Sequence, residues 1–281
     1  MVLVAACSGV TGACGGQSAV DEAVPAGAEA ATPTATDAAT LPDLTVGVAD
    51  GVPVGSLLQA RDLVLDGQQR AVADVVTAAG GGLTAAPGLE GGTAVRFPAY
   101  SAKPDGPDAI VRVEPAGGDW MTPRQRDLDF GLDLKVDALS SGTKRDNGDN
   151  VLQRGLYVDD AQFKIQLDHH VPSCVIRGTA GRVMTVLPQE VRAGQWYRFT
   201  CRRHDDTVTL AVSRLDDQGQ ATDTRTATAS GKIGSLDFSP LTPLSVGGKL
   251  GPVGDPAAAT DQFNGILANV HLSVGEDSGQ R

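Results

Sequence analysis

The run "DLDFGLD" at residues 127–133 places three carboxylates at every second or fourth position among Leu and Phe. Paired carboxylates perform the acid and base chemistry of glycoside hydrolases. Strict alternation predicts a strand with one apolar face and an acidic, solvated face that carries Asp127, Asp129 and Asp133. At ~3.3 Å per residue, Asp129 and Asp133 lie about 13 Å apart, which exceeds the ~5–9.5 Å that glycosidase pairs use. Asp127 and Asp129, about 7 Å apart, fit an inverting pair, so a glucan-cleaving enzyme stays as an alternative.

Other motifs of enzymes and metal sites are missing from the sequence. It has no GxSxG elbow, P-loop, dinucleotide-binding glycine pattern, HExxH or CxxC. His169 and His170 are adjacent, so on a strand they would point to opposite faces, and we expect them in a turn. Trp120, in "GGDWMTP", is the tryptophan that we predict to contact a ligand.

The elements that must position these residues are strands. Gly and Pro account for 35 and 16 of the 281 residues, and aromatic residues for only 4%. Ten alternating or β-branched runs separated by turn residues predict an antiparallel sandwich. They cover residues 92–100, 108–115, 127–139, 161–169, 173–178, 182–188, 195–203, 207–215, 243–250 and 265–274. Residues 54–81 fit either one short helix or a further strand pair.

Charge and hydropathy narrow the classes of partner. The net charge of −11 and the lack of a basic cluster predict no nucleic-acid partner and no anionic membrane surface. No apolar stretch of the sequence approaches the roughly 20 residues that span a bilayer.

The N-terminal region predicts export. "VLVAACSG" is similar to the end of a bacterial lipoprotein signal, in which Cys7 would be lipidated, and we expect the rest of that signal upstream. A chance cysteine in an Ala/Val-rich segment is the alternative. The Ala, Thr, Gly and Pro tract that follows cannot bury a core, so residues 1–42 are predicted to form a truncated signal and a disordered tether.

Two further cysteines bear on compartment. Cys174 and Cys201 lie in strand-like runs, and in an exported β protein they are predicted to form a cross-strand or cross-sheet disulfide. Two reduced, buried cysteines in a cytosolic protein are the alternative. If Cys174 and Cys201 form a disulfide, Cys14 has no assigned role.

The order of segments resembles a known family. "GGTAVRFP", "LDFGLDLKVDAL", "QRGLYVDDAQFKIQLD", "AGQWYRFTCRRHDDTVTLAVS" and "LSVGGKL…DQFNGILANVHLSV" resemble laminin G-like domains of the concanavalin A-like lectin and glucanase superfamily. The "sVGG" strand at residues 245–248 and the "F.G.i.nV" phrase at residues 263–270 are the most specific pieces. The resemblance covers roughly residues 70–275.

The resemblance implies an all-β, antiparallel two-sheet jelly-roll sandwich over residues 43–281. It also implies a calcium ion at one rim, with Asp159 and Asp160 as candidate ligands, for which a polar turn without metal is the alternative. Members of the family mostly bind glycans or proteins rather than transform them. We therefore predict a non-catalytic, extracellular or cell-surface module that binds a glycan or an extracellular protein, with a glucanase or a purely structural envelope module as alternatives.

Overall fold

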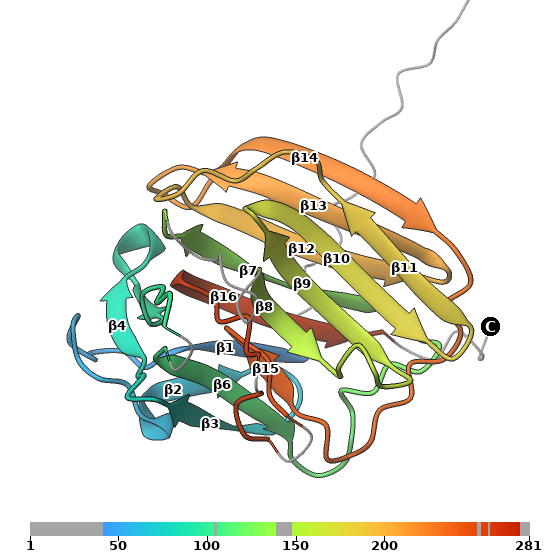
Figure 1. The fold of residues 1–281 in the computed structure, drawn as a ribbon, viewed down its shortest axis with the longest axis horizontal. Helices are drawn as coiled ribbons and strands as arrows, with labels where there is room; N and C mark the ends of the chain where they lie inside the picture. Colours follow the sequence, from blue (N-terminus) through green and yellow to red (C-terminus); the bar gives the residue numbers. More distant parts are fainter. Residues whose placement is uncertain (1–41, 104–105, 139–147, 252–253, 258, 276–281) are drawn as a thin grey trace, which may run out of the picture. The chain divides into compact units, whose positions relative to one another are not determined.

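The computed structural model describes residues 42–103, 106–138, 148–251, 254–257 and 259–275, which lie within one compact unit. Two antiparallel sheets stack face to face in this unit, which confirms the predicted all-β jelly-roll sandwich (Figure 1). The predicted tether, Cys7 and Cys14 lie outside the described residues.

The first sheet has nine strands. Its main path runs β14-β13-β12-β7-β16-β1-β2, and the β4–β5 hairpin joins it through β16. The strands of this sheet are β1 (Leu44–Val48), β2 (Leu63–Asp66), β4 (Thr84–Pro87), β5 (Thr93–Arg96), β7 (Leu128–Val136), β12 (Tyr197–His204), β13 (Thr207–Leu215), β14 (Ala221–Ser230) and β16 (Gly265–Val274).

The second sheet has seven strands in the order β11-β10-β9-β8-β15-β6-β3. They are β3 (Ala71–Ala78), β6 (Asp108–Pro115), β8 (Asp149–Arg154), β9 (Gln162–Asp168), β10 (Val171–Gly178), β11 (Gly181–Val186) and β15 (Leu244–Val246). Two 3-10 helices, η1 (Ala60–Asp62) and η2 (Leu89–Gly91), lie in the connections.

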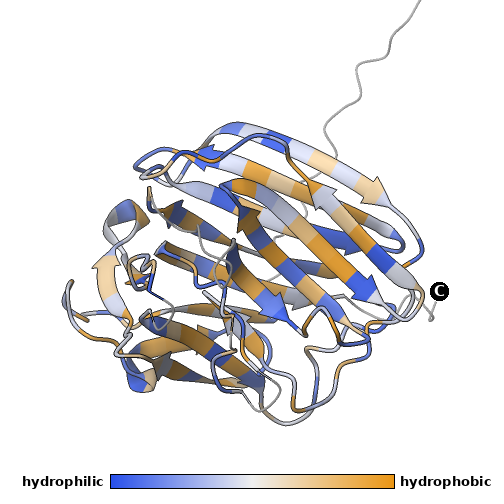
Figure 2. Ribbon diagram, in the orientation of Figure 1, coloured by the Kyte–Doolittle hydropathy of each residue, from blue (hydrophilic) through white to orange (hydrophobic). Residues whose placement is uncertain are grey.

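The core fills the space between the sheets. Hydrophobic and hydrophilic residues alternate along many strands, so each sheet turns one face inward (Figure 2). Phe130 of β7 and Phe163 of β9 meet across the sandwich with ring centroids 4.8 Å apart. Gly247, in the "sVGG" strand, has φ +85°, and a Cβ there would lie 1.9 Å from a ring carbon of Phe97. Only glycine lets that ring pack so closely.

A disulfide joins the two sheets. Cys174 on β10 and Cys201 on β12 are both fully buried and are bonded to each other. The predicted disulfide is therefore confirmed in its cross-sheet form.

Several connections follow the sequence prediction. His169 and His170 form the β9–β10 turn, and both have positive φ, at 50° and 64°. Apart from the three-residue 3-10 helix η1, residues 54–81 do not form the helix that was one alternative. They carry β2 and β3 instead, which lie in different sheets and are not paired with each other.

Candidate ligand-binding site

The acidic run "DLDFGLD" forms most of β7, and its apolar residues point into the core as predicted. Its carboxylates do not form a solvated face. Register places Asp129 opposite Arg202 and Asp133 opposite Arg198 on β12. Asp133 is fully buried and accepts two hydrogen bonds from Arg198, at 2.7 and 2.9 Å. The prediction of an all-solvated acidic face was therefore wrong for Asp133, because a cross-strand arginine compensates its burial.

The electrostatics of Asp129 also oppose a role as catalytic acid. Burial raises the pKa of this carboxyl, but hydrogen bonds and charge from His271 and Arg202 outweigh burial, and the net pKa is lowered. Asp127 is hydrogen bonded to His204, with an Oδ2–Nδ1 distance of 2.8 Å. A glycosidase acid needs a raised pKa, so Asp129 has the wrong electrostatics for the acid of the glucanase alternative.

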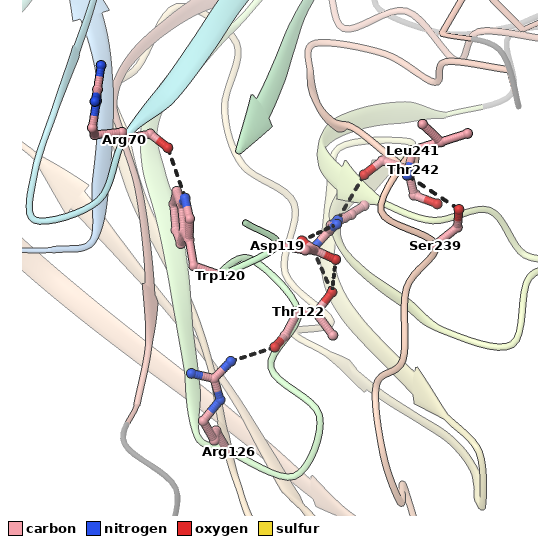
Figure 3. Close-up of polar contacts among 9 residues, drawn as sticks. Arg70, Asp119, Trp120, Thr122, Arg126, Ser239, Leu241 and Thr242 are labelled. Carbon is pink, nitrogen blue, oxygen red and sulfur yellow. Dashed lines mark hydrogen bonds and ion pairs between the residues drawn. The ribbon is translucent and has the colours of Figure 1, made fainter. Parts of the chain in front are cut away.

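Trp120 occupies a structural position (Figure 3). Its indole N–H donates to the carbonyl of Arg70 over 2.9 Å, and its ring packs against the core. The adjacent Asp119 accepts a hydrogen bond from the Thr122 hydroxyl at 2.5 Å. Trp120 is not among the residues that line the pockets described below, and its contact with a ligand stays a prediction. Trp196 packs in a small cluster with Leu215, as the resemblance to laminin G-like domains implies.

Asp159 and Asp160 line a pocket at the rim of the seven-stranded sheet. The pocket has a volume of about 490 Å³, and loop residues Asp237 and Leu241 contribute to its wall. One oxygen of Asp159 accepts the Leu156 N–H at 2.7 Å, and Asp160 is exposed. Three apolar side chains at this rim are open to solvent: Tyr157, Val158 and Leu241, at 68%, 80% and 82%.

The floor of this pocket belongs to the outer face of the sheet. Phe163 and Ile165 of β9 point into the core, so Lys164 between them points outward. Register places Gln153 of β8 beside Lys164, and Ser245 of β15 beside Gln153. These three side chains therefore share one face.

Four buried polar atoms on this face have no protein partner. They are Asn150 Oδ1, Gln153 Oε1, Gln162 Oε1 and Ser173 Oγ, from three adjacent strands. Each of the four residues is 2% exposed. The side-chain N–H groups of Gln153 and Gln162 both donate to the carbonyl of Gly155, at 2.8 and 3.2 Å. The side-chain oxygens of these two residues have no partner within the described protein. Buried polar atoms in native proteins are paired with protein, ordered water or ligand, so the partners of these four atoms are water or ligand.

A second pocket, of about 230 Å³, adjoins the first on this face. Its lining includes Asn150, Lys164 and Asp261, and Lys164 is the cross-strand neighbour of Gln153 in the rim pocket. Burial, followed by the charge of Lys249, lowers the pKa of Lys164 to about 8. Lys249 itself is held by Asp261 over 2.5 Å. We call the two pockets and the sheet face between them the outer-face site.

The oxygen atoms around the rim pocket are of the type that a hard cation such as calcium binds. Carboxylates of Asp159 and Asp160 and the unpartnered oxygen of Gln153 are the oxygen ligands that calcium takes. Among the residues that the structure describes, no three His, Cys, Asp or Glu side chains cluster closely enough to hold a metal ion. Further ligands for an ion would therefore be carbonyl or water oxygens.

Sequence reasoning found the rim acids but missed the sheet face. Gln153, Gln162, Asn150 and Ser173 form no motif, because they come from three strands and meet only through register. The outward positions of "AQFKIQLDH" were the available signal, since Gln, Lys and Gln alternate there with core residues.

Comparison with known proteins agrees with this architecture. Residues 147–274 match the family model described as Laminin G domain. No curated protein matches the chain. The described residues also contain no helix that is long and apolar enough to cross a membrane.

Several of the similar solved structures are binding domains. The binding domain of Paraclostridial Mosquitocidal Protein 1 is 11% identical, with a TM-score of 0.51 over 84% of this chain and 49% of that one. A receptor binding domain is 10% identical, with a TM-score of 0.52 over 84% and 48%. The binding domain of botulinum neurotoxin serotype G is 8% identical, with a TM-score of 0.50 over 84% and 48%. The chain spans about half the length of these structures, and the likeness shows the sandwich fold. The family match supports the predicted laminin G-like domain over residues 147–274.

Proposed function

We propose that the chain is an extracellular, non-catalytic binding module whose outer-face site takes a glycan. The carrying observation is the set of buried, unpartnered amide and hydroxyl atoms on one face of the seven-stranded sheet. Sugar hydroxyls both donate and accept hydrogen bonds, so they complement amide side chains. The laminin G match and the binding domains among the similar structures support a binding role. The buried disulfide supports an oxidising compartment.

A glycan array, followed by titration calorimetry on the best ligand, tests this proposal. Gln153→Met and Lys164→Met keep side-chain volume but remove polar atoms of the site, and each is expected to weaken binding at least about tenfold. Thr200→Ala, on the outer face of the other sheet, is the matched control and should bind like the parent. Failure to bind any glycan, or equal affinity in all variants, would sink the proposal.

A protein ligand is the second candidate. The exposed Tyr157, Val158 and Leu241 form an apolar rim beside acidic residues, an arrangement that suits a protein surface. Leu241→Asp would distinguish the two, because it should abolish capture of a protein ligand and leave binding in the second pocket intact.

We also propose calcium as an ion of the rim pocket, held by Asp159 and Asp160. A ligand of the folded state stabilises by about 1.4 kcal/mol at ten times its Kd, so millimolar calcium should raise the melting temperature. Asp160→Ala should erase that shift, whereas Asp74→Ala, far along the sheet, should keep it. Magnesium should substitute poorly because it demands tight octahedral geometry. No shift up to about 10 mM calcium would remove both residues from the site.

A further inference from the structure

Strand β14 leaves a long sheet edge without a partner. It ends the main path of the nine-stranded sheet and pairs only with β13 among the described strands. With 10 residues it is longer than the other strands that end a sheet path, β2 with 4, β11 with 6 and β3 with 8. Residues 221–226 are all exposed. Such an edge presents a row of unpaired backbone donors and acceptors.

Ladder geometry identifies which backbone groups face the open edge. The Gly231 N–H donates to the Asp206 carbonyl over 3.0 Å, so the neighbouring pair of Thr207 and Ser230 is non-hydrogen-bonded. Because the two kinds of pair alternate, Thr224 and Thr226 turn their N–H and C=O groups away from β13, whereas Thr222 lies at a register shift beside Arg214 and Leu215. These groups are free to bond another strand.

Most of the edge lacks the usual protection against pairing, since an irregularity of the β13–β14 ladder lies only at its start, beside Leu215. The sequence of β14, "ATDTRTATAS", contains no proline, glycine or lysine. Its charged residues, Asp223 and Arg225, have opposite signs, lie 3.4 Å apart and are 48% and 46% exposed. Inward charges block edge pairing when they repel the incoming strand, but an acid and a base two residues apart complement their own antiparallel copy.

We propose that β14 pairs antiparallel with β14 of a second copy of this chain, about a two-fold axis at Thr224. In this register Thr224 lies opposite Thr224 of the second copy, and the edge-facing backbone groups of this pair form about two hydrogen bonds across the axis. Asp223 lies opposite Arg225 of the second copy in a non-hydrogen-bonded pair, where side chains approach most closely. Two-fold symmetry repeats that ion pair, and the nine-stranded sheets of the two copies become one. The interface uses no residue of the outer-face site.

Sedimentation velocity of the full chain tests the proposal. Over about 1–200 µM the parent should shift from monomer to dimer, as small interfaces do. Thr224→Pro removes an edge-facing N–H at a position where an edge strand tolerates proline, so it should stay monomeric with an unchanged fold. Thr224→Val keeps the N–H and should dimerise like the parent.

Charge substitutions provide a second test of dimerisation that leaves the backbone N–H groups of β14 unchanged. Asp223→Arg and Arg225→Asp each place like charges opposite one another, so each protein alone should be monomeric. Mixing the two restores both ion pairs, and the mixture should form dimers. This arm also decides the matter if Thr224→Pro fails to fold. A parent that is monomeric at about 200 µM, or a dimer that these changes leave intact, would overturn the proposal.

Discussion

Arg154 is a charged side chain in the core of the sandwich. It is fully buried on β8, donates to Asp119 over 2.8 Å and to the Thr242 carbonyl over 3.0 Å, and lies 4.6 Å from the centre of the Phe238 ring. Burial lowers the pKa of Arg154, and the charge of Asp119 opposes that effect. The guanidinium therefore ties the loop before β7 and the loop before β15 to β8.

Asp119→Ala should lower the free energy of unfolding. Removing one partner leaves the buried Arg154 charge without its carboxylate, which costs about 3–5 kcal/mol of unfolding free energy. Urea denaturation measures this loss. Asp74→Ala is the control, because the Asp74–Arg112 pair is exposed and its loss should cost about 1 kcal/mol or less. Equal costs for the two variants would contradict the structural role of Asp119.

The lowered pKa of Lys164 predicts that the free energy of unfolding rises as the pH becomes alkaline. Its folded pKa is about 8, against an ordinary value of 10.5, so between these values the unfolded chain binds more protons. The free energy of unfolding then increases with pH across that window, and below about pH 8 this contribution is absent. Thermal melts of the parent and of Lys164→Met from pH 7 to 10 measure it. The parent should gain stability relative to the variant, and parallel curves would refute the shift.

At the scale of elements, the disulfide between β10 and β12 should carry a large share of stability. It closes a loop with a sequence separation of 27, which the chain-entropy model values at about 3–4 kcal/mol. Cys174→Ala together with Cys201→Ala should lower the unfolding free energy by about that amount, and reduction of the parent should do the same. Intact mass should show the loss of two hydrogens in the oxidised parent. Free thiols in protein exported from its own host would contradict the bridge.

Several strands with one buried face could be predicted, whereas β8 and β14, which lack that contrast, were missed. The alternating runs that form β7, β9, β12 and β13 were predicted because polar and apolar residues take turns along them. All six residues of β8 are buried, and its start overlaps "DNGDN", which reads as a turn. β14 contains no large apolar residue: residues 221–226 are exposed, and the small Ala227 and Ala229 pack against the core.

Of the candidate site, only the two rim acids that the family resemblance suggested could be predicted from the sequence. The rim acids lie in one phrase of the sequence, whereas the amides of the sheet face are brought together by pairing between β8, β9 and β10. Register is set by the whole sandwich, so no local pattern could reveal which polar residues share a face.

At the scale of the whole molecule, β1 is an integral strand of the sandwich, although it lies upstream of the region that the resemblance covers. Leu44 and Val46 are buried and β1 pairs with both β16 and β2, so the sandwich begins upstream of the region that the resemblance covers. A chain of residues 42–275 should melt within about 2–4 °C of the full chain. Starting at residue 49 instead removes two buried side chains, about 3–6 kcal/mol, and should lower the melting temperature by about 10 °C or more. Calorimetry compares the three chains, and an unaffected shorter chain would show that β1 is dispensable.

The pairing of β1 with β16 also determines how the domain would respond to pulling. Leu44 lies opposite Leu272, and the Val274 N–H donates to the Asp43 carboxylate over 2.7 Å, so both ends of the domain leave at the same end of one ladder. Tension applied through Pro42 and Gly275 therefore loads the backbone bonds of that ladder one after another, like a zipper, rather than all at once in shear. Under force the first strand would peel away at low load, while the disulfide-linked sheets behind it stayed folded.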